Sequence, residues 1–383
     1  MKRTAFLADA LAEIERDGRT RSLRTVTPLS GMRVLVDGRE AVDFCSNDYL
    51  GLARDAQVAE AAARAARDLG AGSGSARLVT GTRNAHLSLE AELAALVGCE
   101  AALLFGAGYL AGIGIVPALV GRGDAVFSDA LNHACLIDGC RLARADTFVY
   151  PHRDAGALAR ALSSAAGARR RLVVTESVFS MDGDVAPLPE IADLCERFDT
   201  LLVVDEAHAI GVVGAGGEGV VRSLGLERRV DVVMGTLGKA LGAYGAFAAG
   251  SATMVRYLLH RARSVVFQTA LPPPVVGAAR EALRLLREDA TLLPRLRENA
   301  ERLRARLGVA GEPRPAIFPV VLGSEDAAMA ASARRLEAGY LVQGIRPPTV
   351  PPGTSRLRIT VSAAHAPSEI DGLAAAVARI VNT

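Results

Sequence analysis

The sequence predicts an α/β protein built on a mostly parallel β-sheet. Seven short apolar segments alternate with segments of helical composition from about residue 100 to residue 250. They are AALLF, DAVFS, TFVYP, RLVVTE, TLLVVDE, VDVVMG and GAFAAG. These strand segments are apolar on both faces, which is typical of strands buried between two layers of helices. Sheets of this kind bind ligands at the carboxyl ends of their strands. At 383 residues the chain is also long enough to form more than one domain.

Three segments are predicted in chain order. An N-terminal arm over residues 1–50 contains an amphipathic helix and then a hairpin, RVLVDGREAVDF, that turns at Asp37 and Gly38. A large domain is expected over residues 51–274. The proline cluster TALPPP ends it, and the helical and α+β pattern of residues 275–383 predicts a smaller C-terminal domain.

Composition and charge argue against several classes of function. The 44 basic and 42 acidic residues form no basic stripe and only 4% of residues are aromatic, so nucleic acid is not an expected partner. The five cysteines form no CxxC pair and are interpreted as reduced thiols of a cytoplasmic protein. The six histidines lack metal-binding spacing, so no metal is expected. The uncharged segment 101–121 contains five glycines and Pro117, which favours a buried strand–loop–helix unit over a membrane span.

A glycine-rich segment, LLFGAGYLAG, follows the first of these strands and precedes a predicted helix. Its small residues would let backbone N–H groups at the helix N-terminus approach a phosphate group. The spacing of Gly106, Gly108 and Gly112 is also similar to the fingerprint of dinucleotide-binding folds, with Asp129 near the position of a ribose-binding acid. A nicotinamide-dependent oxidoreductase and a tight turn without ligand therefore both stay open at this point.

A buried carboxylate is predicted at the end of the apolar strand TLLVVDE. Asp205 ends this strand, and His208 follows it in the sequence DEAH. A buried carboxylate costs free energy unless it has a fixed partner, and the protonated ring nitrogen of pyridoxal 5′-phosphate (PLP) is such a partner. His208 can lie beside the phenolic oxygen of PLP or support Asp205. An ordinary helix cap is the alternative for Asp205 taken alone.

Lys239, in the segment GTLGKALG, is predicted to hold PLP as a Schiff base. Between residues 230 and 250 the only other charged residue is Asp231. An amine in such apolar surroundings should have a lowered pKa, which a Schiff-base lysine needs. Thr236 and Gly238 supply a hydroxyl group and a flexible turn suited to a phosphate oxygen. Together with the acid and the histidine about thirty residues earlier, Lys239 predicts a PLP-dependent enzyme.

Eight motifs along the chain resemble those of the α-oxoamine synthase family of fold-type I PLP enzymes. In order they are FCSNDYLGL, GSGSARLVTGT, FGAGYLAG, DALNHACLIDGCRLA, TESVFSMDGDVAPLPEI, VVDEAHAIGVVG, GTLGKALGAYGAF and GIRPPTVPPGTSRLRITVSAAH. Members of this family are acyltransferases that join an amino acid to an acyl thioester with loss of carbon dioxide. The last motif is most similar to the members of biotin biosynthesis, which condense L-alanine with a pimeloyl thioester of CoA or acyl-carrier protein.

The resemblance implies a role for each residue that matches a family motif. Lys239 is expected to hold PLP and to move the substrate α-proton, His133 to stack on the ring and orient the thioester carbonyl, and Asp205 to hold the ring nitrogen. The other expected cofactor contacts are Gly108, Tyr109, Ser180, His208 and Thr236. The expected substrate contacts are Arg346 at the substrate carboxylate, and Thr349 with Arg21, or its rival Arg24, at the acyl end. The family also implies a homodimer with the site between subunits.

Some alternatives stay open within this family. Another α-oxoamine synthase would use glycine or serine with a different acyl-CoA. A PLP-binding but catalytically silent domain is a further alternative, although the complete set of His133, Asp205 and Lys239 argues against it. Gly112 stands where relatives often have Asn, and His152 near one motif is interpreted as structural. The sequence does not separate a CoA donor from an acyl-carrier-protein donor.

Overall fold

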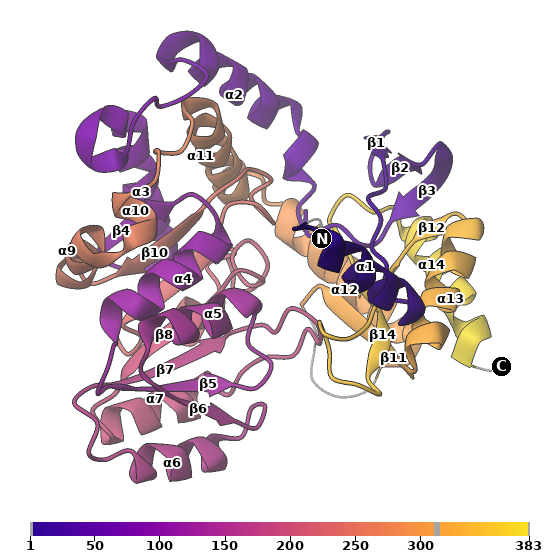
Figure 1. Cartoon of the computed structure of the whole chain (residues 1–383). Coiled ribbons are helices and arrows are strands. Elements are labelled where there is room, and N and C mark those ends of the chain that lie inside the picture. The colour runs from indigo at the N-terminus through magenta and orange to yellow at the C-terminus, as the bar shows by residue number, and fades with distance from the viewer. Residues whose placement is uncertain (1–2, 310–314, 382–383) are drawn as a thin grey trace.

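The computed structural model describes residues 3–309 and 315–381. A large domain surrounds a seven-stranded sheet, and a smaller domain surrounds a three-stranded sheet. Figure 1 shows the two lying side by side, with the large domain at the left and the C-terminal helices α12, α13 and α14 at the right. The large sheet is mostly parallel, as the sequence predicts.

All seven predicted strand segments form the large sheet, in the order β4-β10-β9-β8-β7-β5-β6. Five of these strands run parallel to their neighbours, while β10 pairs antiparallel with both β4 and β9. The strands are β4 (Ala101–Phe105), β5 (Ala125–Asp129), β6 (Asp146–Tyr150), β7 (Arg171–Glu176), β8 (Leu201–Asp205), β9 (Val232–Thr236) and β10 (Ala246–Gly250).

Both faces of this sheet are covered by helices, as strands apolar on both faces predict. Successive residues such as Val173 and Val174 enter two different hydrophobic cores. One core is covered by α2 (Ala56–Leu69), α3 (Asn84–Val97), α6 (Ala155–Ser164), α7 (Leu188–Arg197), α8 (Val220–Ser223) and α11 (Pro273–Glu288). The other is covered by α4 (Gly108–Leu119), α5 (Ala134–Ala143), α9 (Ala252–Arg261) and α10 (Arg263–Val266).

A pair of strands joins the small domain to the arm. In the small domain β11 (Ile317–Gly323), β14 (Ser355–Thr360) and β13 (Gln343–Ile345) pair antiparallel, beside α12 (Leu292–Leu307), α13 (Glu325–Glu337) and α14 (Pro367–Val381). The arm contains α1 (Ala5–Arg16), β1 (Val26–Pro28), β2 (Arg33–Val36) and β3 (Arg39–Asp43). A short strand, β12 (Tyr340–Leu341), pairs with β3 and so fixes the arm to the small domain.

Local predictions in the arm and the glycine-rich segment are confirmed. The β2–β3 hairpin turns at Asp37 and Gly38, whose φ angles of 49° and 83° suit a type I′ turn. Residues 101–121 form β4, a loop and α4 rather than one long helix. Of the helices in the described ranges, none is both long and apolar enough to cross a membrane. The five cysteines carry free thiols.

The domain boundary at residue 274 stays a proposal. α11 follows the proline cluster but packs against α2 and α3 of the large domain. A Cβ atom at Gly277 would lie 2.8 Å from that of Ala65 in α2, so these two helices approach each other closely. This packing favours a boundary after Glu288, between α11 and α12.

Candidate active site

Three neighbouring strands of the large sheet end in polar residues at the same edge. β7 ends at Glu176, β8 at Asp205 and β9 at Thr236, and Glu176 lies opposite Asp205 in the strand register. Lys239 follows β9 in the tight loop that leads to β10. The parallel arrangement therefore brings Asp205 and Lys239 to one site, as the sequence predicts.

Lys239 is partly buried, and its Nζ lies 2.8 Å from Nε2 of His208. Burial lowers the pKa of Lys239 to about 8, although the carboxyl groups of Asp205 and Glu176 act in the opposite direction. A lysine with this pKa has a substantial neutral fraction near neutral pH, and the neutral amine is the form that attacks an aldehyde. Lys239 is one of only two lysines among the 44 basic residues of the chain, the other being Lys2.

Asp205 is only 4% exposed, and its Oδ1 accepts a hydrogen bond from the N–H of Ala207 at 2.9 Å. Burial raises the pKa of this carboxyl, while the nearby charges of Lys239 and His133 lower it. The residue that caps a helix here is Glu206, not Asp205, because Glu206 accepts hydrogen bonds from the first N–H groups of α8. Asp205 is thus a buried acid available to a cationic partner.

His208 belongs to a hydrogen-bonded chain that reaches the far side of the site. Its Nδ1 lies 2.7 Å from the hydroxyl of Tyr49, which donates to Oδ1 of Asn47 at 3.1 Å. Arg358 also donates to Oδ1 of Asn47 at 3.1 Å, and its Nε donates to the carbonyl of Ser180 at 2.6 Å. Burial holds the pKa of His208 well below its usual value, so this imidazole is neutral.

Asn47, Tyr49 and Arg358 are site residues that the sequence did not single out. They lie within the motifs FCSNDYLGL and SRLRITV, so their motifs gave a signal, but no individual role was predicted for them. Asn47 and Tyr49 follow β3, and Arg358 lies on β14 of the small domain. The site therefore lies where the arm, the large domain and the small domain meet.

The N-terminus of α4 faces Thr236 at this edge of the sheet. Gly108 is the first residue of this helix, and its capping position, Ala107, offers no side-chain acceptor to the free N–H groups of the first turn. A Cβ atom at Gly108 would lie 3.9 Å from Oγ1 of Thr236, so the helix N-terminus and the threonine hydroxyl face one small space. Such N–H groups and a hydroxyl suit a phosphate group. Tyr109, in contrast, is 44% exposed and bonds to Asp138.

His133 and Ser180 flank the acid at the end of β7. His133 is the N-cap of α5, and its Nδ1 accepts a hydrogen bond from the N–H of Cys135 at 3.2 Å. Ser180 is buried, and its N–H donates to Oε2 of Glu176 at 3.1 Å. The structure thus gathers His133, Ser180, Asp205, His208, Thr236 and Lys239 at one edge of the sheet.

The predicted substrate residues lie further out. Arg346 donates hydrogen bonds to the carbonyls of Gly18 and Thr20 in the arm, so its guanidinium group holds the arm. Arg21 follows Thr20 directly and lies beside that contact. Arg24 instead acts on Asp37 of the hairpin, whose pKa its charge helps to lower after the hydrogen bonds from Thr25. The contact with Thr20 favours Arg21 over Arg24 as the arm residue nearest to Arg346.

A cavity of about 410 Å³ adjoins the catalytic edge, and the predicted residue Thr349 lines it. The wall on the large-domain side includes Asn132, next to His133, and Ile137, one helical turn further along α5. The opposite wall is the proline-rich loop 347–352 of the small domain. The cavity is therefore mostly apolar and opens beside the predicted catalytic histidine.

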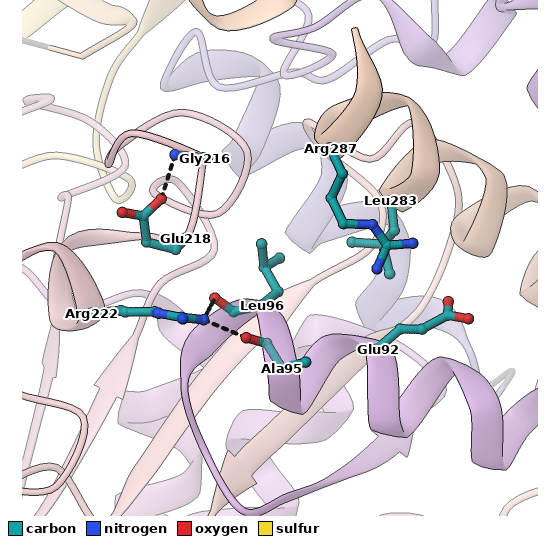
Figure 2. Close-up of a pocket in the computed structure, with 8 residues that line it drawn as sticks. All are labelled: Glu92, Ala95, Leu96, Gly216, Glu218, Arg222, Leu283 and Arg287. Carbon is teal, nitrogen blue, oxygen red and sulfur yellow. Dashed lines mark hydrogen bonds between the residues drawn. The ribbon is translucent and has the colours of Figure 1, made fainter. Parts of the chain in front are cut away.

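Another cavity, of about 350 Å³, lies between α3, α11 and the loop before α8 (Figure 2). Two of its polar side chains already have partners: Glu218 accepts from the N–H of Gly216, and Arg222 donates to carbonyls at the end of α3. None of the predicted site residues lines it. The candidate active site is thus the edge that carries Lys239.

The residues at this edge fit PLP. The helix N-terminus at Gly108 with Thr236 suits its phosphate, the buried carboxyl of Asp205 suits its ring nitrogen, and Lys239 supplies an amine for its aldehyde. These three features lie on separate elements of one sheet edge. If the site bound a dinucleotide instead, the buried carboxyl group of Asp205 and the amine of Lys239 would have no role.

Comparison with known proteins supports the same conclusion. The model of the family described as aminotransferase class I and II matches residues 39–377. The 8-amino-7-oxononanoate synthase of Anaeromyxobacter dehalogenans (strain 2CP-1) is 53% identical over 381 residues, which cover 98% of this chain and 95% of that protein. A serine palmitoyltransferase structure from S. paucimobilis with bound PLP is 29% identical, covers 99% of this chain and 98% of its own, and has a TM-score of 0.92. An 8-amino-7-oxononanoate synthase structure from Francisella tularensis is 26% identical, with coverages of 89% and 98% and a TM-score of 0.77.

The fold and the site thus define a fold-type I transferase whose cofactor is PLP. The chain belongs to the aminotransferase class I and II family and, within it, to the group formed by the 8-amino-7-oxononanoate synthases. Enzymes of this kind act on an amino acid and an acyl thioester.

Proposed function

We propose that this enzyme condenses L-alanine with a pimeloyl thioester to give 8-amino-7-oxononanoate, carbon dioxide and a free thiol in biotin biosynthesis. The observation that carries the proposal is the grouping of Lys239, Asp205 and His208 at one sheet edge in a chain 53% identical to a synthase of that product. A cytoplasmic location, expected from the sequence, stays a prediction.

Lys239 and Asp205 divide the proton chemistry between them. When bound, PLP supplies an electron sink for the negative charge that develops at the α-carbon of the amino acid. Asp205 holds a proton on the ring nitrogen, because a buried carboxylate needs a cationic partner. The Nζ of Lys239 takes the α-proton of alanine, and its lowered pKa suits a general base near neutral pH.

The bonds of the reaction balance without a further reactant. A bond forms between the α-carbon of alanine and the acyl carbon, while the carbon–sulfur bond of the thioester breaks and the thiol leaves with a proton. The alanine carboxyl group then leaves as carbon dioxide, and a proton takes its place on the α-carbon. His133, next in the chain to Asn132 in the wall of the cavity lined by Thr349, is placed to orient the thioester carbonyl.

Arg358 suits the carboxylate of alanine better than the predicted Arg346. Its guanidinium group lies close enough to Lys239 to lower the pKa of that amine, and it bonds to Asn47 at the edge of the site. Both arginines donate two hydrogen bonds, Arg358 to Ser180 and Asn47 and Arg346 to two carbonyls of the arm, so what separates them is the proximity of Arg358 to Lys239. We therefore assign carboxylate recognition to Arg358, where a planar guanidinium can bind both oxygens. Arg346 and Arg21 then hold the N-terminal arm at the end of the site that binds the acyl chain.

A homodimer is part of this proposal. A groove of about 720 Å³ is lined by apolar residues of α4, α5 and α10, among them Leu142, 57% exposed, and Phe267, 70% exposed. Exposed apolar surface of this extent marks an interaction site. Thr269 follows this groove closely in the chain and is the residue expected to reach the phosphate of the partner's cofactor. Sedimentation of the holoenzyme should give the mass of a dimer.

A substrate panel tests the proposed reaction. L-alanine, glycine and L-serine are each combined with pimeloyl-CoA, pimeloyl-acyl-carrier protein and palmitoyl-CoA, and thiol release is measured. The highest kcat/KM is expected for alanine with a pimeloyl thioester. A preference for serine with palmitoyl-CoA, as the names of the structural neighbours suggest for those proteins, would contradict the proposal. Lys239→Ala should remove the activity with every pair.

A further inference from the structure

Glu176 is a buried acid at the site for which the proposed chemistry has no use. It ends β7, lies opposite Asp205 in the strand register and is 2% exposed. One oxygen, Oε1, is buried without a hydrogen-bond partner among the described residues. An orphaned oxygen beside a second carboxyl group calls for an explanation, because each buried charge costs free energy unless it is paired.

The other contacts of Glu176 join the two loops that flank the site. Its Oε2 accepts a hydrogen bond from the N–H of Ser180 at 3.1 Å. The N–H of His133 also points at this carboxyl group. The backbone N–H of Glu176 donates to Oδ1 of Asn132 at 3.2 Å. One side chain thus fixes the backbone on both sides of the cofactor space.

The titratable groups around Glu176 come from three elements. Asp205 on β8 faces it, Lys239 follows β9, and Cys135 stands at the start of α5 beside His133. Burial, followed by the charge of Asp205, raises the pKa of Glu176 to about 8, and Lys239 opposes both effects. Ionisation of both Glu176 and Asp205 beside the single amine of Lys239 would cost free energy. One of the two carboxyl groups is therefore protonated near neutral pH.

We propose that Glu176 is a positioning residue that holds Ser180 and His133 as an uncharged carboxylic acid, which leaves Asp205 as the anion that faces the cofactor ring. A neutral carboxyl group still accepts the hydrogen bond from the N–H of Ser180, and its orphaned Oε1 then carries no unpaired charge. This inference rests on the proposed binding of PLP at Lys239. Ionisation of Glu176 at alkaline pH would add a second negative charge beside Asp205 and change the environment of the ring.

The test compares Glu176→Gln with Glu176→Ala by PLP affinity and by the pH dependence of PLP absorbance. Glutamine keeps an acceptor without a charge, so its dissociation constant for PLP should stay within about threefold of the wild-type value. Alanine should weaken binding by at least about tenfold, because the N–H of Ser180 loses its acceptor and the N–H of His133 loses the carboxyl group that it faces. Wild-type holoenzyme should show an absorbance change above pH 8 that Glu176→Gln lacks.

Glu206→Gln is the matched control. Glu206 is equally buried, and burial raises its pKa to about 7, but its carboxyl group serves the N-terminus of α8. The inference is overturned if Glu176→Gln loses PLP as strongly as Glu176→Ala, if Glu176→Ala binds PLP normally, or if Glu206→Gln removes the same absorbance change. The absorbance comparison needs only the glutamine variants, so an unfolded alanine variant does not decide it. A wild-type protein that binds no PLP would overturn the proposed function as well.

Discussion

The side-chain amine of Lys239 lies 2.8 Å from Nε2 of His208, and this contact sets the tautomer of the histidine. Oδ1 of Asn47 accepts hydrogen bonds from Arg358 and from the hydroxyl of Tyr49. The oxygen of that hydroxyl therefore accepts a hydrogen bond from Nδ1–H of His208. Nε2 is then free to accept from Lys239. A residue of the N-terminal arm thus controls the proton on the imidazole beside the reactive lysine.

Tyr49→Phe should impair this control without emptying the site. Removal of the hydroxyl leaves Nδ1 of His208 without its partner, and a buried group left in this way costs about 1–3 kcal/mol. The expected result is a fall in kcat on the order of tenfold and a shifted pH midpoint of PLP absorbance, with little change in KM. The control is Tyr150→Phe, which removes the hydroxyl of a similarly buried tyrosine on the edge strand β6. Equal effects of the two variants would contradict the assignment.

Arg358→Lys and Arg346→Lys should separate the two arginines by substrate. Lysine cannot reproduce the planar fork of a guanidinium group. The KM for alanine should therefore rise by about tenfold or more in Arg358→Lys. In Arg346→Lys the contacts to Gly18 and Thr20 are weakened, so the KM for the acyl thioester should rise more than the KM for alanine. A larger rise in the KM for alanine in Arg346→Lys would restore the role that the sequence predicts for it.

His152 should make the stability of the protein depend on alkaline pH. Burial lowers its pKa, but the hydrogen bonds to Asp129 and Asp184, each 2.9 Å, outweigh burial and raise it to about 9. Because the folded-state pKa exceeds the unfolded value, the stabilisation is complete below pH 6.5 and is lost as pH rises through about 9. The Tm of wild type should exceed that of His152→Gln at pH 6 and converge with it near pH 10. A difference independent of pH would show that His152 is uncharged.

Gly112→Asn should damage the cofactor site through packing. A Cβ atom at Gly112 would lie 2.8 Å from Cβ and Sγ of Cys135, so α4 and α5 pack closely at this point. An asparagine at this position would force these helices apart, at a cost of about 1–3 kcal/mol. Urea unfolding and PLP titration should both show a weaker protein. Gly121→Asn is the control, since the nearest atom to a Cβ at Gly121 lies at 3.8 Å. Equal losses of stability in the two variants would contradict this account.

The sequence predicts the large sheet well because its strands are apolar on both faces. All seven predicted strand segments form strands, from AALLF at β4 to GAFAAG at β10. Sequence pattern did not predict that β10 runs antiparallel between β4 and β9, because strand direction depends on the path of the chain. The end of the large domain is also hard to predict, since the packing of α11 on α2 joins segments far apart in sequence.

The site was predictable where its residues follow strands of that sheet. Asp205, Thr236 and Lys239 meet because parallel strands end at one edge. Arg358 lies on β14 and Tyr49 lies in the loop after β3, and no periodicity of the sequence shows that they approach Lys239. Arg346 lies in the same C-terminal motif as Arg358, and only the folded chain shows which of the two guanidinium groups faces the lysine.

Attachment of PLP to Lys239 is the central claim, and reductive labelling tests it most directly. Borohydride reduces the Schiff base in the holoenzyme, and mass spectrometry of the peptides then locates the phosphopyridoxyl group. The chain offers only Lys2 and Lys239 as side-chain amines, so the result is unambiguous. The label should appear on the peptide that contains Lys239 and should be absent from Lys239→Ala. A label on Lys2, or no label in a protein that contains PLP, would contradict this account.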